Sequence, residues 1–192
     1  MEIDLTGKTP DVRNLSELEK VVYDKVWFAA ADKSAVLYQM YRKLKIENGL
    51  RYDVTIIPPR MLGVEFVKTK GHVHAGFYGE VYMVLDGEGL YFAQKGDEEK
   101  IEDTFVVHGK KGDVILIPAG YGHVTINPGS APLKTANWVA ETDKGNFEPF
   151  ERNQGACYYY LQSGWVKNPN YKQVPELRFE EPKKEVPANL DF

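Results

Sequence analysis

Residues 69–87 read TKGHVHAGFYGEVYMVLDG, and residues 112–127 read GDVILIPAGYGHVTIN. Both stretches place short runs of Val, Ile, Leu and Tyr beside glycine, proline or aspartate, which is typical of strands that end at tight turns. In the first stretch, His72 and His74 are two residues apart, and side chains at that spacing point to the same face of a strand. The sequence therefore predicts two imidazole rings on one face, close to a turn.

A carboxylate and a third imidazole follow these two rings along the chain. Glu80 begins the next predicted strand, so one of its oxygens would reach both rings if the two strands pair. His123 follows the Pro118–Gly120 turn, which would return it to the same interior. Three imidazoles and one carboxylate suit iron, manganese, nickel or zinc, and an octahedral ion would keep two positions open. A His-x-His pair alone is more often a packing or surface feature, so the prediction depends on all four residues.

The same texture of short apolar runs and turn residues extends over most of the chain. It predicts strands at 35–43, 51–57, 63–69, 80–86, 89–95, 104–108, 113–118, 122–127, 133–140 and 156–161. So many short strands indicate an all-β sandwich or barrel. No internal repeat or linker divides the sequence, and we therefore expect a single domain over residues 1–192 with its core at about 34–166.

The two ends of the chain have a different character. Residues 14–31 are expected to form a helical lead-in, because Ser16 and Glu19 match a capping box and an apolar stripe follows. Residues 167–192 carry four prolines and many charges, so we expect an irregular tail there.

Composition narrows the functional class. Of the 192 residues, 43% are hydrophobic and 27% charged, which is typical of a folded globular chain. Acids outnumber bases 28 to 24, so we expect no nucleic-acid partner. The longest apolar run, Val26–Ala31, is far below the roughly 20 residues of a membrane span, and the N-terminus does not resemble a signal peptide. Cys157 is the single cysteine, which excludes an intrachain disulfide and favours a cytoplasmic location.

The elements around the histidines resemble the two motifs of the cupin superfamily. The first motif is matched in order by His72, His74, Glu80 and Gly87, although the glycine before the first histidine is displaced. The second motif is matched at every position, by Gly112, Pro118, Gly120, His123 and Asn127. The resemblance implies an antiparallel cupin barrel, also called a double-stranded β-helix or jelly roll, with a metal inside.

A narrower resemblance is to the archaeal-type, or cupin, phosphoglucose isomerases. It is carried by residues 69–74 together with 80–82, and it extends upstream to Thr55 and to residues 36–38. That family interconverts glucose 6-phosphate and fructose 6-phosphate in glycolysis and gluconeogenesis. The resemblance implies a cytoplasmic homodimer with one divalent metal per subunit, iron before manganese, nickel or zinc.

The same resemblance implies roles for individual residues. The metal ligands would be His72, His74, Glu80 and His123, and the catalytic residues Glu80 and Tyr82. The sugar phosphate would contact Tyr38, Thr55, Thr69, Gly71 and Tyr82. The sequence departs from the family in a shorter link between His74 and Glu80, and in Asn146, which stands where a phosphate-binding histidine is expected. Lys70 or Lys144 would be the nearest substitutes.

Several alternatives stay open at the level of sequence. Hydrogen transfer between C1 and C2 would proceed by proton transfer with Glu80 as the base, or by a hydride shift. A cupin dioxygenase would use the same four ligands, and a non-enzymatic sugar-binding cupin would share the fold. Core packing is the alternative role for Tyr38 and Tyr82, and His108 is expected to be structural or solvent-facing.

Overall fold

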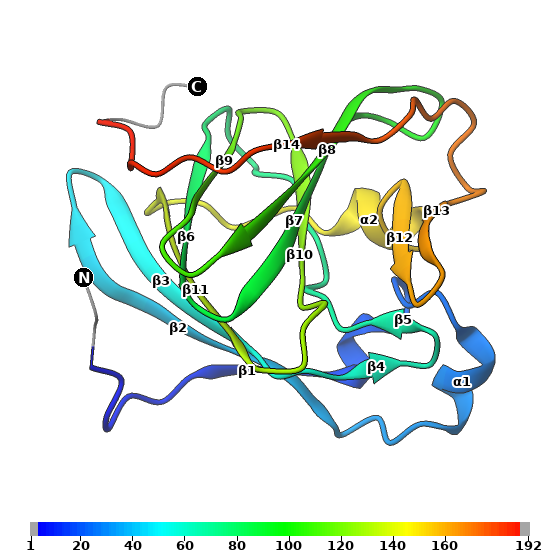
Figure 1. Ribbon diagram of the computed structural model, residues 1–192, viewed down its shortest axis with the longest axis horizontal. Coiled ribbons are helices and arrows are strands. Elements are labelled where there is room, and N and C mark those ends of the chain that lie inside the picture. Colours follow the sequence, from blue (N-terminus) through cyan, green and yellow to red (C-terminus); the bar gives the residue numbers. More distant parts are fainter. Residues whose placement is uncertain (1–3, 189–192) are drawn as a thin grey trace.

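The computed structural model describes residues 4–188, and strands are its main secondary structure (Figure 1). The largest sheet has six strands in the order β1 (Asp11–Asn14), β2 (Val36–Glu47), β3 (Leu50–Ile57), β11 (Leu133–Ala140), β6 (Glu80–Asp86) and β9 (Val114–Ile117). All five pairings within it are antiparallel. The predicted all-β class is therefore confirmed.

Two smaller sheets complete the fold. One contains β10 (Gly122–Ile126), β7 (Glu88–Gly96), β8 (Ile101–Lys110) and β14 (Arg178–Glu180). The other contains β13 (Gly164–Lys167), β12 (Tyr158–Leu161), β5 (Glu65–Phe66) and β4 (Met61–Leu62). Across residues 4–188 the strands form three separate sheets, so the expected jelly-roll barrel is an open sandwich and not a ring of continuous hydrogen bonds.

The side chains of β6 alternate between the core face and the outer face of the sheet. Tyr82 and Val84 belong to the main hydrophobic core, which also takes Phe92 and Val124 from the sheet that contains β7 and β10. Met83 instead packs on the opposite side of the six-stranded sheet. Alternate residues of one strand therefore line the interior, where the site lies.

A second apolar cluster covers the other side of the six-stranded sheet. We call it the outer apolar face, and it consists of Tyr52, Val54, Ala136 and the partly buried Leu5, Tyr41, Leu44, Ile56, Met83, Leu85 and Trp138. Tyr52 and Trp138 meet edge to face, with 5.0 Å between ring centroids. This face is more apolar than the solvent side of an antiparallel sheet usually is.

The helical lead-in is present, but it is two short segments and not one helix over 14–31. Residues Leu15–Leu18 form a 3₁₀ helix (η1) and residues Lys25–Ala30 an α-helix (α1). The amides of Leu15 and Ser16, which have no partner within a helix, donate to carbonyls of residues 35 and 33 and tie the start of η1 to the segment before β2. The cap differs as well, because Glu17 and not Glu19 accepts from a backbone amide, that of Asn14.

The C-terminal tail is mostly irregular, as expected, but two contacts hold it to the sandwich. Its short strand β14 pairs with β8 in parallel, an exception to the predicted antiparallel order, and Lys183 forms a bridge with Val114. Figure 1 shows this red segment crossing the top of the view beside β8 and β9. The prediction also missed β1, β13 and helix α2 (Glu148–Arg152), and it drew too long a strand at 63–69.

His108 and Cys157, which were given no role in the predicted site, lie away from the histidine pair. His108 is at the surface, where its Nε2 lies 2.9 Å from Glu88 Oε2. Cys157 is fully buried, and burial raises the pKa of its thiol to about 12. Among residues 4–188, no helix has the length and apolar composition of a membrane span.

Candidate metal centre and cavity

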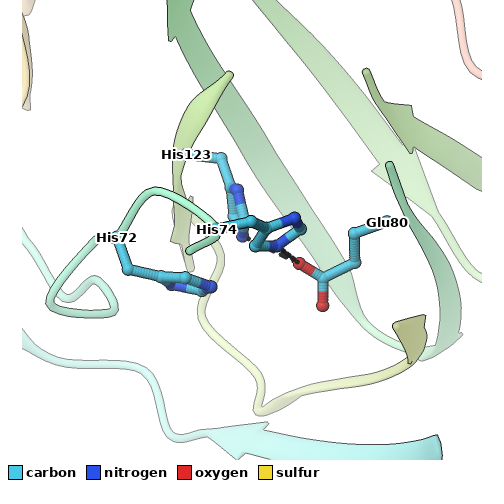
Figure 2. Close-up of side chains that lie close together, drawn as sticks. All are labelled: His72, His74, Glu80 and His123. Carbon is cyan, nitrogen blue, oxygen red and sulfur yellow. Dashed lines mark hydrogen bonds and ion pairs between the residues drawn. The ribbon is translucent and has the colours of Figure 1, made fainter. Parts of the chain in front are cut away.

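Four side chains converge inside the sandwich. We call His72, His74, Glu80 and His123 the His/Glu cluster. One potential ligand atom from each lies within 4.8 Å of the others, and Figure 2 shows the three rings gathered beside the Glu80 carboxylate. The structure thus brings together all four residues that the sequence nominated as metal ligands.

The strand pairing that builds this cluster differs from the predicted one. The segment with His72 pairs with β10, where His72 and His123 exchange backbone hydrogen bonds of 3.3 and 3.0 Å. Glu80 lies on β6, which pairs with β11 and β9. The carboxylate therefore approaches the rings from the six-stranded sheet, and the cluster lies between two sheets.

Glu80 is at the centre of the polar contacts. It is 3% exposed, and its Oε2 lies 3.0 Å from Nε2 of His74 and 3.0 Å from Nε2 of His123. Its Oε1 accepts a 2.7 Å hydrogen bond from the amide of Asn137 on β11. Burial acts to raise the pKa of Glu80, but the hydrogen bonds with His123 and His74 outweigh it and hold that pKa well below its ordinary value. The carboxylate is therefore ionised.

The contacts of His74 show that this cluster needs a cation. Its Nδ1 lies 3.1 Å from the carbonyl oxygen of Tyr78, which only accepts, so Nδ1 carries the proton. The hydrogen bond between Nε2 and Glu80 therefore requires a second proton on the ring, whereas in the neutral ring Nε2 would present a lone pair to the anionic oxygen. Burial acts to lower the pKa of His74, whereas Glu80 raises it more strongly. A proton or a metal ion between these two atoms removes the repulsion.

The other two imidazoles favour a metal over protons. Burial, followed by the nearby His123, lowers the pKa of His72 well below its ordinary value, so this ring stays neutral. Nδ1 of His123 is a buried polar atom with no hydrogen-bond partner among the described residues. Neutral imidazoles with one carboxylate are the donor set that divalent transition metals take in proteins. The residues present therefore fit the metal that the resemblance implies.

A cavity of about 500 Å³ opens beside the cluster, and we call it the site cavity. It is lined by all five residues assigned to the sugar phosphate, Tyr38, Thr55, Thr69, Gly71 and Tyr82. Tyr82 reaches the cluster directly, because its hydroxyl is 3.0 Å from Nε2 of His123. Burial, followed by the negative Glu80, raises the pKa of Tyr82 well above its ordinary value, so its phenol stays protonated.

The hydroxyl groups of Thr69 and Tyr38 also line the cavity. Thr69 Oγ1 accepts from the amide of Thr125 at 3.0 Å, which leaves its own proton free to donate. Tyr38 accepts from the amide of Lys70 at 3.2 Å. Gly71 has a φ of +81°, and a Cβ there would lie 2.7 Å from Val124 and 2.9 Å from Phe150. Only glycine fits this position without displacing the core beneath it.

Sequence reasoning missed several cations of the cavity lining. Arg13 comes from β1, Arg42 and Lys43 from β2, and Arg51 from β3. Arg51, Asp53 and Thr55 are spaced two apart on one strand, a period that would have linked them once Thr55 was placed. Arg42 could have been found in the same way, because it lies four residues after Tyr38 on a predicted strand. Arg13 offered no such signal, because its strand β1 was not predicted.

The structure also places Asn146, which departs from the family pattern, and the two lysines named as its substitutes. Asn146 is not part of the cavity lining, and its side-chain oxygen accepts from the amide of Glu148 at the start of α2. Lys70 and Lys144, the proposed substitutes, both line the cavity. Lys70 is already paired with Glu151.

Comparison with known proteins places these residues in a family context. The family model described as glucose-6-phosphate isomerase matches residues 12–176. The glucose-6-phosphate isomerase of Pyrococcus furiosus is 32% identical over 134 residues, covering 67% of this chain and 69% of that protein. The glucose-6-phosphate isomerase of Thermococcus onnurineus is 29% identical over 185 residues, covering 90% and 95%. A solved structure described as a predicted oxalate decarboxylase of Thermotoga maritima has a TM-score of 0.45, with 22% identity over 73% of this chain and 98% of that one.

The close approach of Gly145 to His72 gives a test of the cluster. Gly145 has a φ of +58°, and a Cβ there would lie 3.0 Å from Cδ2 of His72. We expect Gly145→Ala to displace this ring and to weaken Mn²⁺ binding at least about tenfold, as measured by competition with a chelating dye.

The matched control is Gly112→Ala. Its φ is +89°, so the backbone strain is similar, but no atom lies within 4 Å of the added Cβ. This variant should bind Mn²⁺ as the unmodified protein does. Equal Mn²⁺ affinity for both variants would contradict His72 as a ligand.

Proposed function

The chain belongs to the glucose-6-phosphate isomerase family, and from this membership we propose that it interconverts glucose 6-phosphate and fructose 6-phosphate in the site cavity. One observation carries the proposal. The cavity has the His/Glu cluster on one wall and hydroxyls, a glycine and cations on the others. A sugar phosphate needs both kinds of surface, one for its carbonyl end and one for its dianion.

We propose that the cluster holds one divalent metal ion, and that iron is the preferred metal. Such an ion, when bound, supplies a Lewis acid that stabilises negative charge on the C1 and C2 oxygens of the open-chain sugar. The donor set alone does not select iron, because manganese, nickel and zinc accept the same ligands.

The phosphate end of the substrate would occupy the opposite part of the cavity. The hydroxyls of Thr55 and Thr69 would donate to phosphate oxygens, with the backbone of Gly71 close by. Arg13 and Lys70 would supply positive charge there. Arg13 already contacts Glu17, and Lys70 contacts Glu151, so both cations are held in place before the substrate arrives.

Glu80 and Tyr82 are the proposed catalytic residues. Tyr82 keeps its proton and lies beside His123, so it would donate a hydrogen bond to a sugar oxygen and stabilise charge there. Glu80 would carry the proton between C1 and C2 only by giving up one of its present contacts, because Oε2 faces two imidazoles and Oε1 accepts from Asn137. If these contacts persist, hydrogen transfer as hydride is the remaining route.

We propose that the chain assembles as a homodimer. We also propose that it acts in glycolysis and gluconeogenesis, in the cytoplasm. The family resemblance is the first support for the dimer. The outer apolar face is the second, because a partly buried apolar surface of this kind is typical of sheet-to-sheet interfaces.

The reaction itself is tested by a coupled assay. Purified protein is given fructose 6-phosphate, and glucose 6-phosphate is measured with a dehydrogenase that reduces NADP. We expect turnover that chelation abolishes and that Fe²⁺, Mn²⁺, Ni²⁺ or Zn²⁺ restores. Oxygen uptake without isomerisation would favour the cupin dioxygenase, and binding of fructose 6-phosphate without turnover would favour the sugar-binding cupin.

The phosphate role of Thr55 is tested by Thr55→Val, which keeps the shape of the side chain and removes its donor. Loss of a hydrogen bond to a charged group predicts a rise in KM for fructose 6-phosphate of about tenfold or more, with a smaller change in kcat. Inhibition by inorganic phosphate should weaken by a similar factor. Thr6→Val, at an exposed threonine outside the cavity lining, should change neither value. An unchanged KM in Thr55→Val would remove this residue from the phosphate site.

The homodimer is tested by sedimentation equilibrium. The expected mass is twice the 21.8 kDa of one chain. Substitution of Met83 by glutamate places a charge on the outer apolar face and should shift the mass toward one chain. A single-chain mass for the unmodified protein would contradict the proposal.

A further inference from the structure

The link between His74 and Glu80 carries a tyrosine that contacts the histidine in two ways. The carbonyl of Tyr78 accepts from Nδ1 of His74, and the two rings stack with 5.2 Å between centroids and 30° between planes. Tyr78 therefore determines which nitrogen of His74 carries the proton and where the ring points.

The position of Tyr78 depends in turn on a second loop. Its phenol donates a 2.9 Å hydrogen bond to Oδ1 of Asp143, which follows β11 and is 8% exposed. The same oxygen accepts from the amide of Gly145, the residue that touches His72. Asp143 thus joins the loop before β6 to the loop after β11.

Arg51 connects this junction to the six-stranded sheet. Its Nη1 donates to the carbonyl of Asp143 at 2.8 Å, and its Nη2 lies 3.9 Å from the Asp143 carboxylate. Its Nε donates to Asp53, also on β3, at 2.8 Å. A continuous series of contacts therefore runs from β3 through Arg51, Asp143 and Tyr78 to His74.

We propose that Tyr78 is a positioning residue for the metal centre, and that its hydroxyl, anchored on Asp143, keeps the Nε2 lone pair of His74 directed at the ion. The inference rests on the proposed metal site, since His74 would not need a fixed orientation if it bound no metal. It adds Tyr78 and Asp143 to the residues that set metal affinity, although neither is a ligand.

Tyr78→Phe removes the phenol oxygen but retains the ring and the carbonyl. Loss of an outer partner of a metal-bound histidine typically weakens metal binding 10- to 100-fold, and we expect about a tenfold rise in the dissociation constant for Mn²⁺. The measurement is titration of metal-free protein against a chelating dye. Asp143→Asn retains an oxygen that accepts from Tyr78, so its dissociation constant should lie between those of the unmodified protein and Tyr78→Phe.

A matched control exists elsewhere in the chain. Tyr121 also donates to an aspartate that an arginine holds, because its hydroxyl lies 2.7 Å from Asp103, which pairs with Arg178. Tyr121→Phe thus removes the same kind of hydrogen bond from a tyrosine outside the cavity lining. Its Mn²⁺ affinity should stay within about twofold of the unmodified protein.

A second readout needs no metal. In metal-free protein at a pH where imidazole is neutral, the ¹⁵N spectrum should show His74 with its proton held on Nδ1. In Tyr78→Phe we expect a mixture of tautomers and faster exchange of that proton with water. A purely structural hydrogen bond would lower the unfolding midpoint without changing the tautomer.

The outcomes separate this inference from the proposed function. If the unmodified protein binds no Mn²⁺, the metal site fails, while the tautomer measurement still tests whether Tyr78 orients His74. If the unmodified protein binds Mn²⁺, and Tyr78→Phe matches it in both affinity and tautomer, the positioning role is overturned and the metal site stands.

Discussion

A buried carboxylate that two imidazole nitrogens approach at the same oxygen is the constraint on which the site depends. Glu80 stays ionised out of contact with water, and a charge in that position requires close compensation. The protein supplies one amide donor, from Asn137, to one carboxylate oxygen, and it places Nε2 of His74 and Nε2 of His123 each 3.0 Å from the other oxygen. The arrangement is balanced when a cation occupies the centre, so the same geometry that is costly in the empty protein favours metal binding.

The fold spreads this centre over two sheets. Glu80 comes from the six-stranded sheet, whereas His123 comes from β10 and is fixed to His72 by a pair of backbone hydrogen bonds. Relative movement of the sheets would therefore separate the carboxylate from the rings. The shared hydrophobic core between them, with Tyr82 and Val84 facing Phe92 and Val124, resists that movement. Packing of this core thus contributes to the precision of the site.

The sequence predicted the parts of this site that are local in the chain. The spacing of His72 and His74, the strand start at Glu80 and the turn before His123 all depend on neighbouring residues, and the structure brings these four together. It did not predict which strand pairs with the histidine segment, because strand pairing joins residues about 50 positions apart. The helix expected at 14–31 is interrupted between Leu18 and Lys25, where the amide of Tyr23 donates to Glu65 and the carbonyl of Val21 accepts from Lys68, both distant along the chain. Asn146 stands where the resemblance implies a histidine, and the structure shows its side-chain oxygen accepting from the amide of Glu148 at the start of α2.

The burial of Cys157 has a consequence for how the protein responds to metals and to alkylating reagents. A neutral thiol enclosed in the core offers no thiolate to soft ions such as zinc or copper, so selection among metals is left to nitrogen and oxygen donors. A reagent reaches the sulfur only when the core opens. The rate of Cys157 alkylation therefore reports how often the sandwich opens.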